Sequence, residues 1–366
     1  MINILRCKPV LFVIFLFIFC GLSGFVQADD SRQLVSEQLL KEAGLEIVWE
    51  TKLPLKPGES LKELQILNGR LYALTDRNYI VSFNRENGKI VFSRPIAEAG
   101  FPLPELELYE EEILTIIGSR LVEINPDSGV ELGSKHLEFG ATCPAARNSS
   151  YFYIGGEDRR LHTLRAANKI QVFEVAAESD SMITAITADE SFVVFGTDAG
   201  DLISFRANEP KKLWSFTAED TIIRPMARDE WSLFVASKDT NVYRINLVTG
   251  RNDWKYPAGA VLNKGPLVTA DVVYQYVHNK GLAAIGKESG KKLWLVDKGA
   301  EILAQADGKA YVITKIGTLV VMDNEQGKHL YTVNFAGVSR YAGNVADSKL
   351  YIANENGRIA CLKPSK

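Results

Sequence analysis

The side chains able to do chemistry in this chain of 366 residues are few and widely spaced. Four histidines share no spacing that is typical of a metal site, and these are His136, His162, His278 and His329. Four cysteines are present and none is adjacent to another: Cys7, Cys20, Cys143 and Cys361. No Gly-x-Ser-x-Gly elbow, phosphate-binding glycine loop or His-Glu-x-x-His motif occurs. The sequence therefore predicts no catalytic residue and no metal site.

A repeat of about 40 residues organises the rest of the chain. An apolar residue, called the anchor here, ends the third strand of each repeat, and successive anchors lie 37 to 41 residues apart. The anchors are Phe83, Ile124, Leu164, Phe205, Ile245, Ile285, Met322 and Leu362. Nine residues after the first seven anchors stand Phe92, Gly133, Phe173, Trp214, Trp254, Trp294 and Tyr331. Large aromatic side chains at six of these seven positions indicate a shared packing role.

The stretch 241–254 is the clearest copy of the repeat, and it reads as two strands joined by a turn at Gly250. Five residues after the anchor, a glycine recurs in five repeats, because a tight hairpin turn needs a residue that tolerates positive φ. Lys169 and Pro210 are the two exceptions. Four short strands in about 40 residues predict the blade of an all-β propeller, and period-2 alternation disfavours helical repeats.

The eighth repeat lacks its fourth strand, since the chain stops four residues after Leu362. The segment Gly44–Leu53 reads as an orphan strand, and its Trp49 stands 43 residues before Phe92. We therefore expect residues 44–366 to form eight four-stranded antiparallel blades, with the N-terminal strand completing the last blade. Such closure removes the open sheet edge that a linear array would expose.

The hairpins from Ile245 to Trp254 and from Ile285 to Trp294 resemble the tryptophan-docking repeat of the PQQ-like, or quinoprotein-type, β-propellers. The resemblance implies that each repeat aromatic packs against the glycine turn of the neighbouring blade. The residues to which this structural role is assigned are Trp49, Phe92, Phe173, Trp214, Trp254, Trp294 and Tyr331. Size, leader and blade number are also similar to the BamB-type subunits of the outer-membrane β-barrel assembly machinery.

Quinone catalysis is the activity that the quinoprotein resemblance raises first. The dehydrogenases of that superfamily hold PQQ above a calcium ion, usually with adjacent cysteines and an acidic base. This chain has no Cys-Cys pair, since Cys143 and Cys361 fall in different repeats. We therefore expect no cofactor and no enzyme activity. An enzyme or small-ligand receptor that uses the central channel is the alternative.

The first 28 residues are typical of a secretory signal peptide, with Arg6 and Lys8 before an apolar run and small residues before Ala28. Cleavage is expected after Ala28, and lipid attachment at Cys20 or a membrane anchor is the alternative. Without the signal the formal charge falls from −3 to −5, which gives no reason to expect nucleic acid. Residues 29–43 are expected to form a short helix that Asp30 or Ser31 caps and Gly44 ends.

Polar side chains are expected at one mouth of the central channel, because the first strand of a propeller blade lines it. Positions 21 residues before the anchors, with their neighbours, give Lys62, Arg224, Arg228, Lys264, Glu301, Arg340 and Tyr341. An excess of cations there would suit an acidic peptide or small anion, and a water-filled channel with solvated charges is the alternative. Trp231 falls outside the repeat phase and is a candidate interface residue, or packs under a neighbouring loop.

These observations favour a non-catalytic, exported scaffold in the periplasm or at the outer membrane. Rigid propellers present variable loops on two faces, so binding is the expected use when no catalytic constellation is visible. The expected partners are envelope proteins, with the outer-membrane barrel assembly machinery as the specific hypothesis. After signal cleavage no segment is long and apolar enough to span a membrane.

Overall fold

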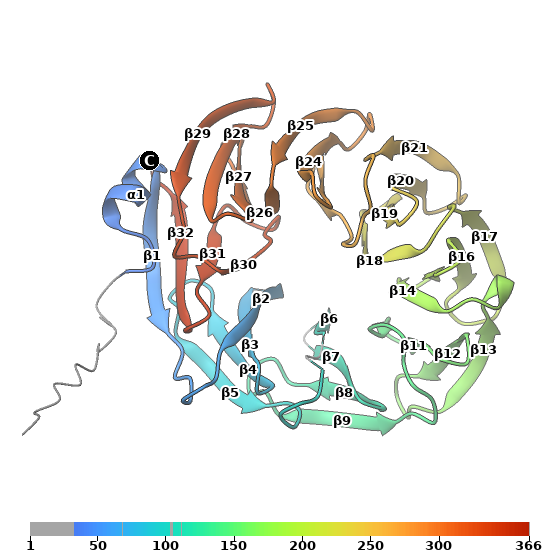
Figure 1. Ribbon diagram of the computed structural model, residues 1–366. Coiled ribbons are helices and arrows are strands. Elements are labelled where there is room, and N and C mark those ends of the chain that lie inside the picture. The colour runs from blue at the N-terminus through green and yellow to red at the C-terminus, as the bar shows by residue number, and fades with distance from the viewer. Residues whose placement is uncertain (1–32, 68, 103–104, 111, 366) are drawn as a thin grey trace, which may run out of the picture. The chain divides into compact units, whose positions relative to one another are not determined.

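The computed structural model describes residues 33–67, 69–102, 105–110 and 112–365, and Leu34–Lys366 form one compact unit. The unit contains eight four-stranded antiparallel sheets that follow one another around a ring (Figure 1). The first strand of a blade lies nearest the centre and the fourth lies at the rim. The prediction of an all-β, eight-bladed propeller is confirmed. The predicted signal peptide and Cys20 lie outside the described residues.

The first four blades each use four strands that are consecutive in the chain. Blade 1 contains β2 (Leu61–Leu67), β3 (Arg70–Thr75), β4 (Tyr79–Asn84) and β5 (Ile90–Pro95). Blade 2 contains β6 (Glu107–Tyr109), β7 (Glu112–Ile117), β8 (Arg120–Ile124) and β9 (Glu131–His136). Blade 3 contains β10 (Ala146–Arg147), β11 (Tyr151–Gly155), β12 (Arg160–Arg165) and β13 (Gln171–Ala176). Blade 4 contains β14 (Ile183–Ala188), β15 (Phe192–Thr197), β16 (Asp201–Arg206) and β17 (Lys212–Thr217).

The last four blades follow the same order except for the final one. Blade 5 contains β18 (Ile222–Arg228), β19 (Ser232–Ser237), β20 (Asn241–Asn246) and β21 (Asn252–Pro257). Blade 6 contains β22 (Leu267–Val268), β23 (Val272–Val277), β24 (Gly281–Gly286) and β25 (Lys292–Asp297). Blade 7 contains β26 (Gly299–Ala306), β27 (Lys309–Thr314), β28 (Thr318–Asp323) and β29 (Lys328–Asn334). Blade 8 contains β30 (Arg340–Ala342), β31 (Leu350–Ala353), β32 (Arg358–Pro364) and the N-terminal β1 (Leu45–Lys52).

The ring closes through the pairing of β1 with β32, as the sequence predicts. Gly44 precedes β1 with a φ of 62°, and its carbonyl accepts a hydrogen bond from Ser365 N at 2.9 Å. Tyr331 of blade 7 lies beside Gly44, and its hydroxyl donates to Ala43 O at 3.0 Å. Gly44 thus occupies the place of a turn glycine, although no hairpin turn joins β32 to β1.

A β-bulge recurs at the anchor in each of the seven blades that are continuous in sequence. The aromatic at the outer strand then reaches the next blade. A Cβ atom built on the turn glycine of that blade would lie only 2.5 Å from the ring of Trp49 at Gly88 and 2.7 Å from that of Trp254 at Gly290. Phe92 and Trp214 make the same approach to Gly129 and Gly250. Only a residue without a side chain fits under these rings, and the positive φ favours glycine as well.

Indole hydrogen bonds add to this packing. Trp49, Trp214 and Trp254 each donate their Nε1 hydrogen to a backbone oxygen two residues after the anchor of the next blade, at 2.7–2.8 Å. Trp294 donates to the side-chain oxygen of Asn324 at the same place. Phe173 has no such hydrogen, and instead Tyr153 of the same blade donates its hydroxyl to Ala207 O at 2.8 Å. At the contact between blades 3 and 4, a tyrosine hydroxyl thus replaces the tryptophan indole as the donor to this backbone oxygen.

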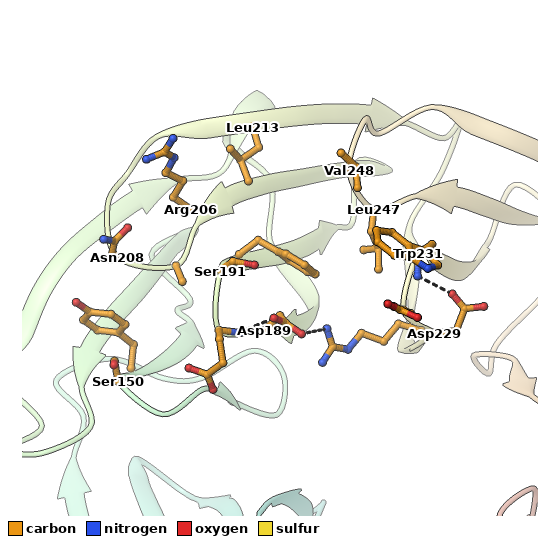
Figure 2. A pocket seen from close by; sticks show the side chains of 16 residues that line it. Ser150, Asp189, Ser191, Arg206, Asn208, Leu213, Asp229, Trp231, Leu247 and Val248 are labelled. Carbon is orange, nitrogen blue, oxygen red and sulfur yellow. Dashed lines mark hydrogen bonds and ion pairs between the residues drawn. The ribbon is translucent and has the colours of Figure 1, made fainter.

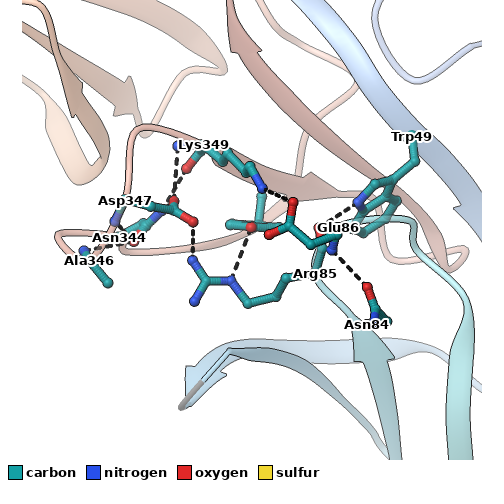
Figure 3. A network of polar contacts seen from close by, with 9 residues as sticks. Trp49, Asn84, Arg85, Glu86, Asn344, Ala346, Asp347 and Lys349 are labelled. Carbon is teal, nitrogen blue, oxygen red and sulfur yellow. Dashed lines mark hydrogen bonds and ion pairs between the residues drawn. The ribbon is translucent and has the colours of Figure 1, made fainter.

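The contact between blades 8 and 1, called the closing seam here, carries a polar network in addition (Figure 3). Arg85 is 9% exposed and donates from Nε to the Tyr351 hydroxyl, while its guanidinium pairs with Asp347. Lys349 pairs with Glu86 at 2.7 Å. These side chains come from β31, the turn before it and the outer hairpin of blade 1, so they link the two ends of the propeller sequence.

The hydrophobic core is divided among the contacts between blades. One cluster joins blades 4 and 5 through Trp214, Leu233 and Ile245, and others repeat this arrangement around the ring. Five fully buried tyrosines stand 11 residues before an anchor, and these are Tyr72, Tyr153, Tyr274, Tyr311 and Tyr351. This set was missed by the sequence analysis, although its constant offset from the anchors could have revealed it.

The N-terminal helix is shorter than expected. Helix α1 spans Glu37–Glu42, and Ser36 accepts a hydrogen bond from Leu39 N as its N-cap. The expectation that Asp30 or Ser31 caps this helix is wrong, because the N-cap is Ser36, five or six residues further along the chain. Leu34, Val35 and Leu40 are buried in the cluster of blades 7 and 8, so tertiary packing stabilises a helix too short to be stable alone.

Candidate functional site

The two ends of the ring differ in the connections they carry. The end at which first strands begin, called the entry face here, holds the connections between blades and the turns between second and third strands. The opposite end, the exit face, holds the turns between first and second strands and between third and fourth strands. Lys62, Arg224, Glu301 and Tyr341 lie within the first three residues of their strands, so the structure places them toward the entry face.

Arg228 and Trp231 lie at the other end of the propeller. Arg228 is the last residue of β18 and pairs with Leu233, whereas Ile222 at the start of that strand pairs with Ser237. Trp231 follows in the turn to β19. Placing Arg228 at the same channel mouth as Arg224 is therefore wrong, because the chain runs along β18 from Arg224 to Arg228 toward the opposite face.

Three of the cations at the entry side of the channel face carboxylates. Arg224 of blade 5 pairs with Glu105, which precedes blade 2, at 2.6 Å, so this ion pair reaches across the channel. Lys264 pairs with the buried Glu301. Arg340 donates from Nε to Leu61 O at 3.1 Å and lies 3.9 Å from Glu355. The expected excess of cations is therefore largely neutralised within the protein itself.

A cavity of about 560 Å³ inside the channel is lined by Glu63, Glu105, Glu107 and Arg224 among other residues. The Glu107 side chain is accessible from the channel, but many protein atoms lie close to it. The resulting loss of hydration raises its pKa to about 7. The nearby charge of Glu105 raises the pKa further. Three carboxylates against one guanidinium make this cavity unsuited to an anion.

A larger hollow of about 1270 Å³ lies on the exit face over blades 3, 4 and 5, and we call it the groove (Figure 2). Tyr151 and Phe192, the first residues of β11 and β15, line it together with Trp231 in the turn before β19. Turns between third and fourth strands contribute Asn208, Leu247 and Val248. Figure 2 shows Trp231, Leu247 and Val248 on one side of the groove, and Arg206, Asn208 and Ser150 on the other.

The groove exposes apolar surface that the fold does not use. Trp231 is 60% exposed, Val248 is 67% exposed and Leu213 is 45% exposed. Trp231 is held by its backbone, which donates to Asp229 Oδ1 at 3.0 Å and accepts from Leu247 N at 2.9 Å. The indole is therefore presented on a fixed turn without being buried. An exposed aromatic on a rigid support is typical of a protein-binding residue.

The polar rim of the groove is ordered by ion pairs and hydrogen bonds. Asp189 pairs with Arg228 at 2.7 Å. Burial would raise the pKa of Asp189, but the hydrogen bond and charge of Arg228 outweigh it and hold the pKa below its usual value. Glu190 accepts hydrogen bonds from Ser149, which lower its pKa. The rim therefore keeps its carboxylates ionised at neutral pH.

Other reactive side chains do not form a site in the described part of the chain. Burial raises the pKa of the free thiols of Cys143 and Cys361 to about 12, so these cysteines are unreactive near neutral pH. Within the described ranges no group of three His, Cys, Asp or Glu side chains is placed to hold a metal ion. No described helix is long and apolar enough to cross a membrane.

Sequence comparisons find similarity to an outer-membrane assembly factor. The family model described as "Outer membrane protein assembly factor BamB" matches residues 222–363. BamB of Nitrosomonas eutropha is 24% identical over 230 residues, which cover 61% of this chain and 53% of that protein, or about half its length. BamB of Shewanella oneidensis is 22% identical over 293 residues, covering 75% of this chain and 67% of that protein.

A solved structure supports the same fold. The crystal structure of BamB from Moraxella catarrhalis has a TM-score of 0.65 at 15% identity, and covers 87% of this chain and 97% of that one. At this level of identity the likeness concerns the fold alone. The matched family segment, 222–363, runs from the start of β18 in blade 5 into β32 of blade 8.

Proposed function

We propose that this chain, a PQQ-like propeller similar to the outer-membrane assembly factor BamB, is a non-catalytic scaffold that binds proteins in the cell envelope and assists outer-membrane protein assembly. The names of both curated relatives support an assembly role, and neither name is that of an enzyme. The same similarity supports a location in the periplasm or at the outer membrane. Its partners are envelope proteins, with the barrel assembly machinery as the specific expectation.

The observation that carries the proposal is the groove on the exit face. It combines an exposed indole, two exposed aliphatic side chains and a charged rim within one hollow over three neighbouring blades. A binding site of this kind offers an apolar centre with a polar edge, which is the usual composition of protein interfaces. Because every lining residue comes from a turn or strand of the rigid ring, little ordering accompanies binding.

Photo-crosslinking in the native envelope tests this function. A photoreactive phenylalanine analogue at Val248 is expected to capture a subunit of the barrel assembly machinery, whereas the same analogue at Leu132 on the rim of blade 2 captures none. The two side chains are both well exposed, at 67% and 53%, so they form a matched pair. Adding Trp231→Ala should reduce capture at Val248 at least about tenfold, because exposed aromatic anchors dominate binding energy.

Equal capture from both positions, or capture that Trp231→Ala leaves unchanged, would remove the groove as the binding site. Capture of envelope proteins other than assembly subunits would retain a scaffold and reject the assembly role. The Trp231 side chain is exposed, so its loss is not expected to unfold the protein.

A further inference from the structure

The entry face of blades 6 and 7 carries a cluster of lysines that the proposed function does not use. Lys280 lies in the turn between β23 and β24, Lys298 connects blades 6 and 7, and Lys315 lies in the turn between β27 and β28. Lys298 N donates to Lys280 O at 3.0 Å, and Lys315 N donates to Lys298 O at 2.9 Å. Lys298 is therefore a direct neighbour of both Lys280 and Lys315 on the surface, although 35 positions separate Lys280 from Lys315 in sequence.

No carboxylate neutralises the charges of these three lysines in the part of the chain that the structure describes. All three residues are exposed. The Lys280 ammonium donates to Ala258 O at 3.0 Å, and that of Lys315 lies 4.8 Å from the centre of the Tyr276 ring. Asp297 is the neighbouring acid, at the end of β25, which leaves these four side chains a net charge of +2. This contrasts with the paired cations at the channel.

Two exposed aliphatic side chains lie beside the lysines. Ile316 follows Lys315 in the same turn and is 64% exposed. Val261 is 50% exposed, and its carbonyl accepts a hydrogen bond from His278 N, two residues before Lys280. The surface therefore combines ammonium groups with aliphatic tips on short turns. This combination suits the headgroup layer of an anionic membrane, where lysines meet phosphates and aliphatic side chains meet the acyl boundary.

The compact unit also begins at this face. The carbonyl of Leu34 lies 2.7 Å from the position of a Cβ on Gly337, in the connection between β29 and β30. This connection belongs to the entry face, next to blade 7. We propose that Lys280, Lys298 and Lys315, with Val261 and Ile316, form a surface that lies against the anionic headgroups of a phospholipid membrane. The groove on the exit face then points away from the lipid, toward protein partners.

Vesicle binding tests the proposal with the purified full chain. Phosphatidylcholine vesicles with and without phosphatidylglycerol are compared by co-sedimentation at low ionic strength and again at high salt. The protein is expected to bind better to the anionic vesicles and to lose that preference in salt. The double variant Lys280→Glu/Lys315→Glu should lower the preference at least about 25-fold, since each basic side chain near such a surface contributes about fivefold.

The matched control reverses two lysines of the same blades on the exit face, Lys291→Glu/Lys328→Glu, and should keep the preference. Lys298 is left unchanged because its backbone φ is 56°, so a substitution there could change the stability of the turn as well as the charge. Equal binding to both vesicle types, or equal losses in the two double variants, would overturn the proposal. Circular dichroism and melting of each variant confirm folding. Because the groove is intact in both, failure here would leave the scaffold function untouched.

Discussion

Two contacts between neighbouring blades solve one geometrical problem with different chemistry. At the closing seam, Trp49 covers Gly88 and donates its indole hydrogen to Arg85 O at 2.8 Å. Between blades 2 and 3, the aromatic is replaced by Gly133 and the turn glycine by Lys169. A Cβ on Gly133 would lie 3.3 Å from the Lys169 ammonium, so the lysine occupies space that an aromatic fills elsewhere.

An ion pair stabilises this second contact. Lys169 Nζ lies 2.5 Å from Glu123 Oε2, and Arg147 approaches the other oxygen of that carboxylate at 3.1 Å. The Glu123 side chain is 9% exposed, so screening by solvent is weak. In both contacts a side chain fills the space between neighbouring blades, although the residue type that fills it differs. At the closing seam blade 8 supplies the large side chain and blade 1 supplies the glycine. Between blades 2 and 3, blade 2 supplies the glycine and blade 3 supplies the lysine.

The largest expected effect is at the closing seam. Trp49→Ala should lower the free energy of unfolding by about 3–5 kcal/mol through the cavity that it leaves. Trp49→Phe keeps an aromatic ring but removes the indole hydrogen bond. The loss of this hydrogen bond should lower the free energy of unfolding by about 1 kcal/mol, in addition to the effect of the smaller ring. Denaturant unfolding measures both, and amide exchange in β1 should accelerate most in the alanine variant. An unchanged melting temperature for Trp49→Ala would contradict the packing role of this residue.

A swap between the two kinds of contact is expected to give an intermediate effect. Gly133→Trp alone should clash with Lys169, and Lys169→Gly alone should deprive Glu123 of a partner, each at about 1–3 kcal/mol. The double variant recreates an aromatic over glycine, and Lys169 already has the positive φ of 55° that glycine favours. A double-mutant cycle should therefore show favourable coupling of at least about 1 kcal/mol. Additive losses would mean that the two fillings are not equivalent.

The smallest effect on stability is expected from Glu107 in β6 of blade 2, the blade that makes the ionic contact. Its pKa is raised to about 7 in the folded protein, from an ordinary value of 4.5. The folded state therefore binds this proton more tightly, so the contribution of Glu107 to stability falls as pH rises from about 4.5 to about 7. Glu107→Gln should raise the melting temperature at pH 8 and leave it unchanged at pH 4.

The control for this effect has the opposite sign. Hydrogen bonds from Ser134 and Arg120 lower the pKa of Glu131 in the same blade. Its stabilising contribution is present above the ordinary pKa and is lost in acid, so Glu131→Gln should lower the melting temperature at pH 8. Parallel pH profiles for the two glutamine variants would argue against both assignments.

The repeat alone was enough to predict the blade number and the pairing of the N-terminal strand with the last blade. Both follow from the constant phase of anchors and aromatics, which reports on packing within and between neighbouring repeats. Lys169 and Gly133 were read as separate exceptions, because a single sequence does not show that the two positions meet. Gly44 was read as a helix end, and its place under Tyr331 emerges only when β32 has brought the chain ends together.

The surfaces were harder to predict than the core. Trp231 was singled out because it broke the repeat phase, and the structure places it in the groove. Arg228 was assigned to the wrong face, since proximity in sequence to Arg224 does not convey direction along a strand. The pairing of Arg224 with Glu105 joins residues 119 positions apart, and no local pattern announces such a contact.

The composite eighth blade also imposes an order in time. Strand β1 is synthesised first, yet β32, the strand with which it pairs among the described residues, begins at Arg358, about three hundred residues later. Pairing over such a separation is slow, because a long chain must be ordered before the contact forms. Trp49 can meet the hairpin of blade 1 much earlier, since Gly88 and Arg85 follow it closely. The contact of Trp49 with blade 1 therefore spans fewer than forty residues of sequence, whereas the pairing of β1 with β32 spans the whole propeller.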